Sequence, residues 1–300
     1  MGRRIEPEGI AGYPIDFSIK ASEPIWPPPW VHDGNYVEVA VFQWGLGCYE
    51  RYLGEGDERW LAAALGAGRH AVDQQHRGGR LDGGWIHHSP FWHTFPVRPP
   101  WLSAMAQGEG ASLLVRLYGE TGEESFVESA RRALKPLRVP SSAGGVRALL
   151  DGNPFPEEYP TDPPSYVLNG GIFALWGLRD VGVALDDSRA RAEFEEGVDG
   201  FAASIHRWDT GFWSRYDLFP HPVANLASSF YHQLHISQLH ATNILSPRPE
   251  LRAAAERFEA YAASPMSRRR AFAAKGIFRL LVPRNRLLAR RLPWSRLRAA

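Results

Sequence analysis

Residues 157–171 read Glu-Glu-Tyr-Pro-Thr-Asp-Pro-Pro-Ser-Tyr-Val-Leu-Asn-Gly-Gly, and here a loop gives way to a helix. Proline follows Tyr159 and recurs at 163–164. It excludes a helix over the first half of the stretch, because proline lacks an amide hydrogen and restricts the residue before it. The apolar run from residue 166 onward begins a helix. Acid and base groups on such a stiffened loop form a candidate proton-transfer site, and an ordinary acidic surface turn is the alternative.

Helical patterns extend outward from this segment and arrive in pairs. Apolar residues recur at helical spacing, and Asp57 is an expected N-cap. The expected helices cover residues 36–54 and 57–76, 101–119 and 122–136, 166–183 and 187–206, and 226–245 and 249–263. Because strand signal is weak, the sequence predicts an all-α fold in which about four helical hairpins form an (α/α) toroid or barrel.

Three expected loops are longer than helical connections usually need. They span residues 77–100, 137–165 and 207–225, and each follows the second helix of a pair. A toroid would place such loops on the same rim. We therefore expect a cleft at that end of the inner helices.

Composition indicates a large core and limits the class of site. The 300 residues are 44% hydrophobic and 12% aromatic. Eleven tryptophans and ten tyrosines suit a carbohydrate-binding cleft, and a large core would use them as well. The single cysteine, Cys48, excludes an intrachain disulfide and a cysteine-based metal cluster.

The net charge of +1 hides a strong asymmetry. Residues 268–300 contain eleven Lys or Arg and no acidic residue, so positions 1–267 hold 23 basic and 33 acidic residues, a charge of −10. An acidic body argues against a nucleic-acid partner. Apolar residues alternate with the arginines of the tail. We therefore expect peripheral contact with an anionic membrane surface, with a packed basic helix or a disordered tail as the alternatives.

The chain is expected to have three parts. These are an extended N-terminal arm rich in Pro and Gly (residues 1–35), a helical catalytic domain (36–265) and a basic amphipathic tail (266–300). The first residues show no apolar run typical of a secretory signal, and no segment resembles a spanning helix. The expected location is cytoplasmic, at the inner membrane surface if the tail binds lipid.

Short motifs give the chain a family resemblance. They follow one order along residues 10–245, and the ordered set is more specific than any single motif. They are Phe42-Gln-Trp-Gly-Leu-Gly, Asp82-Gly-Gly-Trp, Trp101-Leu-Ser-Ala-Met-Ala-Gln-Gly, Gly144-Gly-Val, Glu157-Glu-Tyr-Pro-Thr, Ser165-Tyr-Val-Leu-Asn-Gly, Tyr216-Asp-Leu, and Asn225-Leu-Ala with Tyr231-His and His235-Ile. The chain resembles the C-terminal domain of the D-glucuronyl C5-epimerase family, known from heparan sulfate biosynthesis.

The resemblance implies an (α/α) barrel, in agreement with the hairpin pattern. The animal enzymes also carry an all-β domain after the first of these motifs. Here only one helical segment separates the corresponding motifs, so that domain is absent. Either a homodimer or a more open site is expected to compensate.

The implied reaction sets requirements on the site. C5 epimerisation of a uronic acid removes the hydrogen next to the carboxylate and returns a proton to the opposite face. Two proton-transfer groups must lie on opposite sides of C5, with donors or cations around the carboxylate. If side chains neutralise that charge, no metal or other cofactor is needed. The expected substrate is an anionic polysaccharide or lipid-linked glycan, and the expected enzyme class is an isomerase.

The resemblance places the family's proposed acid and base groups on Glu158, Tyr159, Tyr216 and Tyr231. Modest desolvation makes a carboxylate a base near neutral pH, whereas a tyrosine, with a pKa of about 10, serves more readily as an acid. We interpret Glu158 and Tyr231 as the opposed pair. Tyr159 and Tyr216 would orient the substrate or stabilise the enolate-like intermediate. A buried core position is the alternative for each tyrosine.

Four further side chains are candidates for substrate contact. Gln107 and Asn169 would hydrogen-bond sugar hydroxyls or the carboxylate, with capping or core roles as the alternative. Trp85 and Trp101 would form stacking platforms for sugar rings.

Histidines and an arginine complete the candidate set. His232 and His235, three residues apart on one helix, suggest no third metal ligand and would bind the carboxylate. The animal enzymes have an arginine shortly after the Tyr-Asp-Leu motif, and Phe219 stands at that place here. Arg215 and His221 flank the motif as partial substitutes.

Other functions share the predicted fold. A polysaccharide lyase would abstract the same proton and then expel the C4 substituent, and a glycoside hydrolase would cleave the chain without that step. A glycan-binding protein that keeps the cleft without catalysis is the non-enzymatic alternative.

Overall fold

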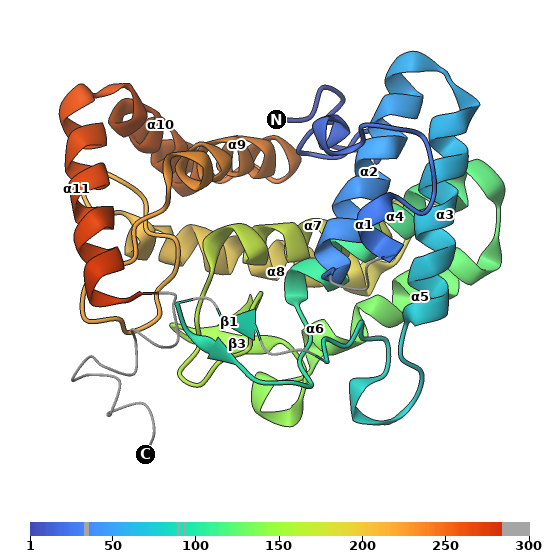
Figure 1. The fold of residues 1–300 in the computed structure, drawn as a ribbon, viewed down its shortest axis with the longest axis horizontal. Helices are drawn as coiled ribbons and strands as arrows, with labels where there is room; N and C mark the ends of the chain where they lie inside the picture. Colours follow the sequence, from blue (N-terminus) through green and yellow to red (C-terminus); the bar gives the residue numbers. More distant parts are fainter. Residues whose placement is uncertain (33–35, 89–90, 93, 284–300) are drawn as a thin grey trace.

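The long helices of the described residues form four hairpins (Figure 1). The computed structural model describes residues 1–32, 36–88, 91–92 and 94–283. The pairs are α2 (Glu38–Glu55) with α3 (Glu58–Gln74), α4 (Ala104–Thr121) with α5 (Glu124–Ala133), α7 (Leu168–Ala184) with α8 (Ser188–Ser204), and α9 (Ser229–Leu245) with α10 (Pro249–Ala263). The all-α prediction is confirmed, and the observed bounds lie within a few residues of the expected ones.

Shorter elements occupy the arm, the loops and the C-terminal part. They are η1 (Ser18–Lys20), α1 (Pro29–His32), η2 (Gly79–Leu81), β1 (Phe91–Trp92), β2 (Pro96–Val97), α6 (Lys135–Arg138), η3 (Ser141–Ala143), β3 (Arg147–Leu150), β4 (Asn153–Pro156), η4 (Ile205–Trp208) and α11 (Pro265–Leu281). Both strand pairs are antiparallel, β1 with β2 and β3 with β4. Each pair is a small hairpin within one of the long loops.

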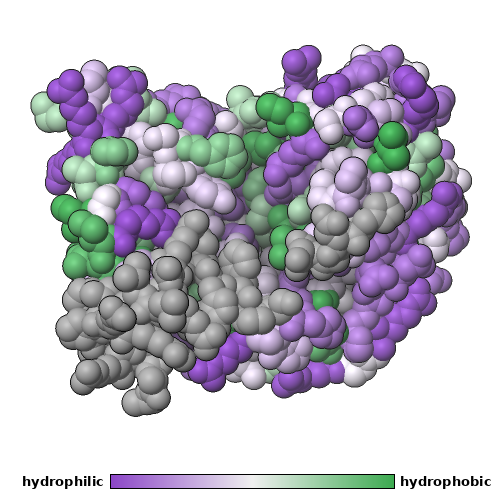
Figure 2. All heavy atoms as spheres, viewed as in Figure 1, coloured by the Kyte–Doolittle hydropathy of each residue, from purple (hydrophilic) through white to green (hydrophobic). Residues whose placement is uncertain are grey.

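The hairpins follow an arc. Among the inner helices, α4 packs against α2 and α7, and α7 packs also against α9. The second helix of each pair covers the outside. In the described part of the chain, α9 is not packed on α2, so the arc does not close into a barrel (Figure 1). The surface is hollowed between the side of the arc that holds α2 and the side that holds α9 (Figure 2).

The N-terminal arm fills the inside of the arc. Tyr13 and Ala21 are fully buried, and the Tyr13 ring stacks on Phe173 at 6.3 Å and meets Trp176 edge-on at 5.8 Å. The inner helices therefore bury apolar side chains against the arm as well as against one another, which explains why an arc of this size is stable without closing.

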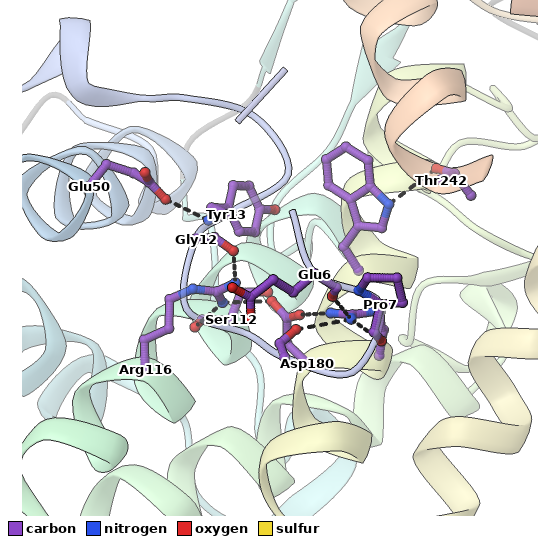
Figure 3. A network of polar contacts seen from close by, with 12 residues as sticks. Glu6, Pro7, Gly12, Tyr13, Glu50, Ser112, Arg116, Asp180 and Thr242 are labelled. Carbon is purple, nitrogen blue, oxygen red and sulfur yellow. Dashed lines mark hydrogen bonds and ion pairs between the residues drawn. The ribbon is translucent and has the colours of Figure 1, made fainter. Parts of the chain in front are cut away.

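Polar groups at the C-terminal ends of the inner helices hold the arm (Figure 3). Arg116 of α4 pairs with Asp180 of α7 at 2.6 Å and donates to the carbonyl of Gly12 at 2.9 Å. Arg179 binds the other oxygen of Asp180 at 3.1 Å and donates to the carbonyls of residues 6, 7 and 9. We call this network the closed end of the arc.

Side-chain caps begin several helices, one of them at the predicted residue. Asp57 accepts from the backbone N–H of Arg59 at the start of α3, as expected. Ser103, Asp187 and Ser228 cap α4, α8 and α9 in the same way. Each cap satisfies a backbone donor that the first helical turn leaves open.

The start of the predicted tail is a helix. α11 packs on the body through Ala271 and Phe278, the first of which joins a small cluster with Trp213 and Leu226. The rest of the tail, residues 284–300, lies outside the described residues. No helix within the described residues combines the length and the apolar character that crossing a bilayer would require.

Candidate active site

The three long loops meet at one end of the inner helices. Phe95 and Trp101 come from the first loop, Tyr159 from the second and Tyr216 from the third, and they pack into one cluster together with Tyr231 near the start of α9. The expectation that these loops share a rim is confirmed. The cluster borders a cavity of about 420 Å³, which is large enough for a small ligand.

The N-terminal halves of all four inner helices line this central cavity, and the arm forms its floor. The lining residues are Met1, Ile15, Asp16, Phe17, Ile19 and Lys20 of the arm, Val39 and Gln43 of α2, Met105 of α4, Glu158 and Tyr159 of a loop, Asn169 and Phe173 of α7, and Phe230, Tyr231, Gln233, Leu234 and Ser237 of α9. Helix N-termini carry partial positive charge. Because first-turn residues of all four inner helices line the cavity, this charge favours an anionic ligand.

Glu158 lies at the wall of the central cavity with little exposure to solvent. Burial raises the pKa of its carboxyl group to about 7, while a hydrogen bond from Tyr159 acts in the opposite direction. Its Oε2 atom is buried and has no hydrogen-bond partner. A carboxylate that titrates near neutral pH and has a free acceptor oxygen is suited to act as a general base.

Gly170, in the first turn of α7, makes room for this carboxyl group. A Cβ atom at position 170 would lie 2.4 Å from Glu158 Oε2 and 2.5 Å from Glu158 Cβ. The glycine of the Val-Leu-Asn-Gly motif therefore allows the loop to approach the helix closely.

The neighbouring carboxylate has a different role. Glu157 is fully buried, and its oxygens accept from the N–H and hydroxyl groups of Ser165 and from the N–H of Tyr166. Burial raises its pKa to about 7. These bonds hold the proline-rich loop against the start of α7, so Glu157 fixes the backbone that presents Glu158.

The tyrosines extend from Glu158 as a chain. The Tyr159 hydroxyl bonds Glu158 and also bonds the Tyr216 hydroxyl. The Tyr216 ring lies 4.8 Å from the Tyr231 ring, measured between centroids. Burial, together with the nearby Glu158, raises the pKa of Tyr159 and of Tyr216 well above the usual value. Both phenols therefore stay protonated and act as donors. The structure brings together all four residues that were predicted to be catalytic.

Asn169 also reaches the central cavity, as predicted. It is the second residue of α7, is almost fully buried, and has an Oδ1 atom without a hydrogen-bond partner. Since buried polar atoms in proteins are nearly always bonded, this acceptor and Glu158 Oε2 are open positions for hydroxyl or N–H donors of a ligand.

Trp101 lies beside the site rather than in the central cavity. It stacks on His87 at 4.1 Å and lies 5.9 Å from the Tyr159 ring. With His87, Val37 and Val39 it lines a side cavity of about 60 Å³, whose wall includes Glu158 and Tyr159. Only 6% of Trp101 is exposed, so a sugar ring would meet its edge and not a free face.

Gln107 and Trp85 do not reach the cavity, which corrects the predicted substrate contacts. The Gln107 amide donates to the carbonyls of Gly83 and Ala133 and accepts from the N–H of Trp85. The Trp85 indole is fully buried and donates to the carbonyl of Ala71. Both side chains fix the Asp-Gly-Gly-Trp loop.

His232 and His235 lie behind the site instead of facing a ligand. Their Nδ1 atoms share the Ser214 hydroxyl, at 2.7 and 2.9 Å, and His232 Nε2 bonds the carbonyl of Phe258. Burial lowers the pKa of His232 to about 4 and that of His235 to about 3, so neither is a cation at neutral pH. Among the described residues no group of His, Cys, Asp or Glu has the arrangement of a metal site.

Arg215 and Phe219 do not line the cavity either. Arg215 is half-buried away from it, and burial lowers the pKa of its guanidinium. Phe219 packs against Phe95 at 5.3 Å and His221 at 4.8 Å. The position that carries an arginine in the animal enzymes is thus part of an aromatic cluster here.

The structure adds residues that the sequence analysis missed. Gln43 of α2 lines the central cavity and donates at 2.8 Å to Glu109, which is fully buried in α4. Burial raises the pKa of Glu109 well above its usual value. Val39 and Gln43, four residues apart in α2, share a helix face, and this spacing was the available signal. Lys20 of the arm had no signal in the sequence.

Fold and site together define a protein of helical hairpins in which a buried carboxyl group and three tyrosines lie together at the N-terminal ends of the inner helices. A family model described as D-glucuronyl C5-epimerase C-terminus matches residues 82–260, more than half of the chain. The chain therefore belongs to the D-glucuronyl C5-epimerase family.

Two relatives show the extent of the likeness. The D-glucuronyl C5-epimerase of Caenorhabditis elegans is 36% identical over 172 residues, which cover 51% of this chain and 28% of that protein. An uncharacterized protein of Methanocaldococcus jannaschii is 30% identical over 144 residues, covering 46% of this chain and 45% of that protein. The matched part spans less than half of either relative.

Proposed function

We propose that this chain inverts the configuration at C5 of D-glucuronyl or related uronic acid residues in an anionic glycan. The observation that carries the proposal is the meeting of Glu158 and Tyr231 at the wall of one cavity, although 72 positions separate them in the sequence. The family and the orientation of four helix N-termini toward the cavity support an anionic sugar as the ligand.

Glu158 is the base in this proposal. As a carboxylate it accepts the C5 proton, and the electron pair left at C5 delocalises into the uronate carboxyl group to give an enolate-like intermediate. Its pKa of about 7 places enough of the group in the basic form at neutral pH. Asn169 and the protonated Tyr159 are placed to bind the sugar or the intermediate.

Tyr231 is the acid. Its hydroxyl gives a proton to C5 from the opposite face, so one turnover leaves Glu158 protonated and Tyr231 as a phenolate. The hydrogen bonds from Glu158 through Tyr159 to Tyr216, and the contact of Tyr216 with Tyr231, offer a path for the proton to return to Tyr231. The same groups can then catalyse the next turnover.

Exchange in heavy water tests the proposal. The protein is incubated with glucuronate-containing oligosaccharides in D₂O, and the products are analysed by mass spectrometry and NMR. We expect deuterium at C5 and the appearance of the C5 epimer without chain cleavage. An unsaturated product absorbing in the ultraviolet would identify a lyase, and cleavage without deuterium a hydrolase. Either result would reject the epimerase.

Two variants serve as internal controls. Glu158→Gln keeps the shape of the side chain and removes the base, so exchange should fall by about 10²–10⁴-fold. Glu158→Gln protein that binds the glycan as wild type does, while wild type shows no exchange, would instead support a glycan-binding protein. Tyr231→Phe should retain part of the first proton abstraction but form little inverted product.

A further inference from the structure

We infer that Lys20 of the arm is the cation that binds the uronate carboxylate and so determines the specificity of the site for acidic sugars. The inference rests on the proposed function, because it names the partner of the substrate's charged group. It stands on the position of Lys20 at the central cavity and on the charges around it.

Lys20 supplies the only cationic side chain among the described residues that line the central cavity. The cavity also contains Asp16 and Glu158, and the buried Glu109 lies behind it, bonded to Gln43. Without Lys20, no charged side chain at the cavity would offset the repulsion between these carboxyl groups and an anionic sugar. An ammonium group at the cavity offsets that repulsion and the charge that develops on the carboxylate when C5 loses its proton.

The arm holds Lys20 in a defined backbone position. The backbone of η1 is fixed by a bond from Ser18 N–H to the Asp16 carboxylate and by a bond from Arg51 of α2 to the Ser18 carbonyl. The carbonyl of Phe17 passes so close to α2 that a Cβ at Gly47 would lie 2.3 Å from it. The backbone is therefore anchored, while the long side chain of Lys20 remains exposed and able to turn toward a ligand.

No other described side-chain cation lines the central cavity, although Met1, which carries the α-amino group of this sequence, lines it as well. Arg215 does not line the cavity, and Phe219 is packed among aromatic rings. His232 and His235 are neutral at neutral pH because they are buried. The central cavity thus has hydrogen-bond donors, the carboxyl group of Glu158, the phenol of Tyr231 and one lysine side chain.

Binding measurements separate this inference from the proposed function. The full chain is titrated calorimetrically with a glucuronate oligosaccharide and with the same oligosaccharide after reduction of its carboxyl groups. Lys20→Gln should weaken binding of the acidic glycan by roughly ten- to a hundredfold and leave binding of the reduced glycan unchanged. Lys20→Arg, which keeps the charge, should recover most of the affinity.

Lys135→Gln is the matched control, because Lys135 pairs with Asp82 on the surface and does not line the cavity. It should bind both glycans as wild type does. Equal affinity of Lys20→Gln and wild type for the acidic glycan would overturn the inference while the epimerase proposal stands. Wild type that binds neither glycan would overturn both.

A separate observation concerns α11. One side of this helix packs on the body through Ala271 and Phe278, and the other side is exposed. Met266, Phe272 and Leu280 are 79%, 84% and 78% exposed, and they lie among the exposed Arg268, Arg269 and Arg270. Hydrophobic residues lie beside hydrophilic ones at the edge of the molecule where α11 runs (Figure 2).

We propose that this outer face of α11, defined by Met266, Arg269, Phe272, Ile277 and Leu280, docks on an anionic lipid surface. A helix that exposes large apolar side chains among arginines can insert the former at the headgroup boundary and pair the latter with lipid charge. The chain continues beyond α11 with six further arginines and no acidic residue over positions 284–300.

Vesicle sedimentation tests this surface with the full chain. Wild type should bind vesicles of phosphatidylserine and phosphatidylcholine, less in high salt, and should not bind pure phosphatidylcholine. Phe272→Glu/Leu280→Glu should reduce binding at least about tenfold. Ile25→Glu, at an apolar residue that is 58% exposed in the arm, is the control and should bind normally. Equal binding of the double variant, or equal binding to uncharged vesicles, would reject the proposal.

Discussion

The two ends of the inner helices hold buried carboxylates in opposite ways. At the closed end, Asp180 has an arginine on each oxygen, Arg116 at 2.6 Å and Arg179 at 3.1 Å (Figure 3). At the cavity, Glu158 has an oxygen without any partner, and burial raises its pKa to about 7. One end pairs its charge and ties down the arm. The other leaves one oxygen of its carboxyl group without a hydrogen-bond partner, as the proposed base requires.

The difference indicates that stability and reactivity are separated along the helix axes. A paired buried charge is costly to break, whereas an unpaired one weakens the fold when it ionises. Substitutions at the two ends should therefore move stability and activity in different directions. Variants at each end test whether stability and activity are separated in this way.

The largest effect is expected at Glu158. Glu158→Gln should lower C5 exchange by about 10²–10⁴-fold because the base is lost. The same change should stabilise the protein above pH 7, by up to roughly 3 kcal/mol, since the buried carboxylate no longer has to ionise. Exchange rates and thermal unfolding at pH 8 measure both. A variant that is inactive and less stable than wild type would argue against the comparison.

Breaking the network at the closed end should have the converse result. Arg116→Met leaves Asp180 with Arg179 alone and frees the carbonyl of Gly12, so unfolding free energy should drop by about 3–5 kcal/mol. Exchange by the folded protein, assayed well below its unfolding temperature, should stay within a few-fold of wild type. Chemical denaturation measures the free energy of unfolding. Loss of activity equal to that of Glu158→Gln would show that the two ends are coupled.

A smaller effect is expected from filling the space beside the base. In Gly170→Ala the new methyl carbon would lie 2.4 Å from Glu158 Oε2 and 2.5 Å from Glu158 Cβ, which is closer than van der Waals contact allows. The carboxyl group must shift, and a displacement of this size in a catalytic group costs about 10²-fold in rate. Gly276→Ala, on α11 with open space around its Cβ position, is the control. Unchanged exchange by Gly170→Ala would mean that the position of Glu158 is not critical.

The smallest effect is the response to pH. With a pKa of about 7, Glu158 should lose roughly tenfold in exchange rate for each pH unit below 7 and reach a plateau above it. The contribution of Glu158 to the free energy of unfolding changes with pH in the opposite direction. A carboxyl group whose folded pKa is raised contributes fully below its usual value of 4.5, and this contribution is lost as pH rises toward 7.

Unfolding temperatures between pH 4 and 8 test the sign. Glu158 and Glu157, both with pKa values of about 7, should lower the stability of wild type as pH rises through this range, whereas the buried His232 and His235, with pKa values of about 4 and 3, act in the opposite direction. The contribution of Glu158 is therefore read from the difference between Glu158→Gln and wild type, which should shift in favour of the variant as pH rises from 4 to 8. A difference that does not change with pH would place the shifted pKa elsewhere.

Much of the architecture could be predicted because it is encoded locally. Apolar periodicity and the cap at Asp57 indicate where the helices lie. The prolines at positions 160, 163 and 164 exclude a helix in the loop before α7. The convergence of Glu158 with Tyr231 followed from the family resemblance and from loops expected on one rim. These features depend on short-range sequence, or on a motif order that the family shares.

The errors concern where polar side chains point. Gln107, Trp85 and His232 lie on or beside buried inner helices, where they bond backbone carbonyls of the neighbouring outer helices. Sequence alone does not separate such a residue from one that faces a ligand, because both are polar groups at apolar-face positions. The role of Lys20 was hidden for another reason. It depends on contacts between the arm and α2 that no periodic pattern encodes.

The course of the arm also affects how the chain reaches its native state. Contacts between the arm and Arg179 join residues that are 170 to 173 positions apart. Closing a loop of that length is slow, and it cannot occur until α7 has left the ribosome. The arm can contact α2 early, but its bonds to Arg179 must wait until more than half of this sequence has been made.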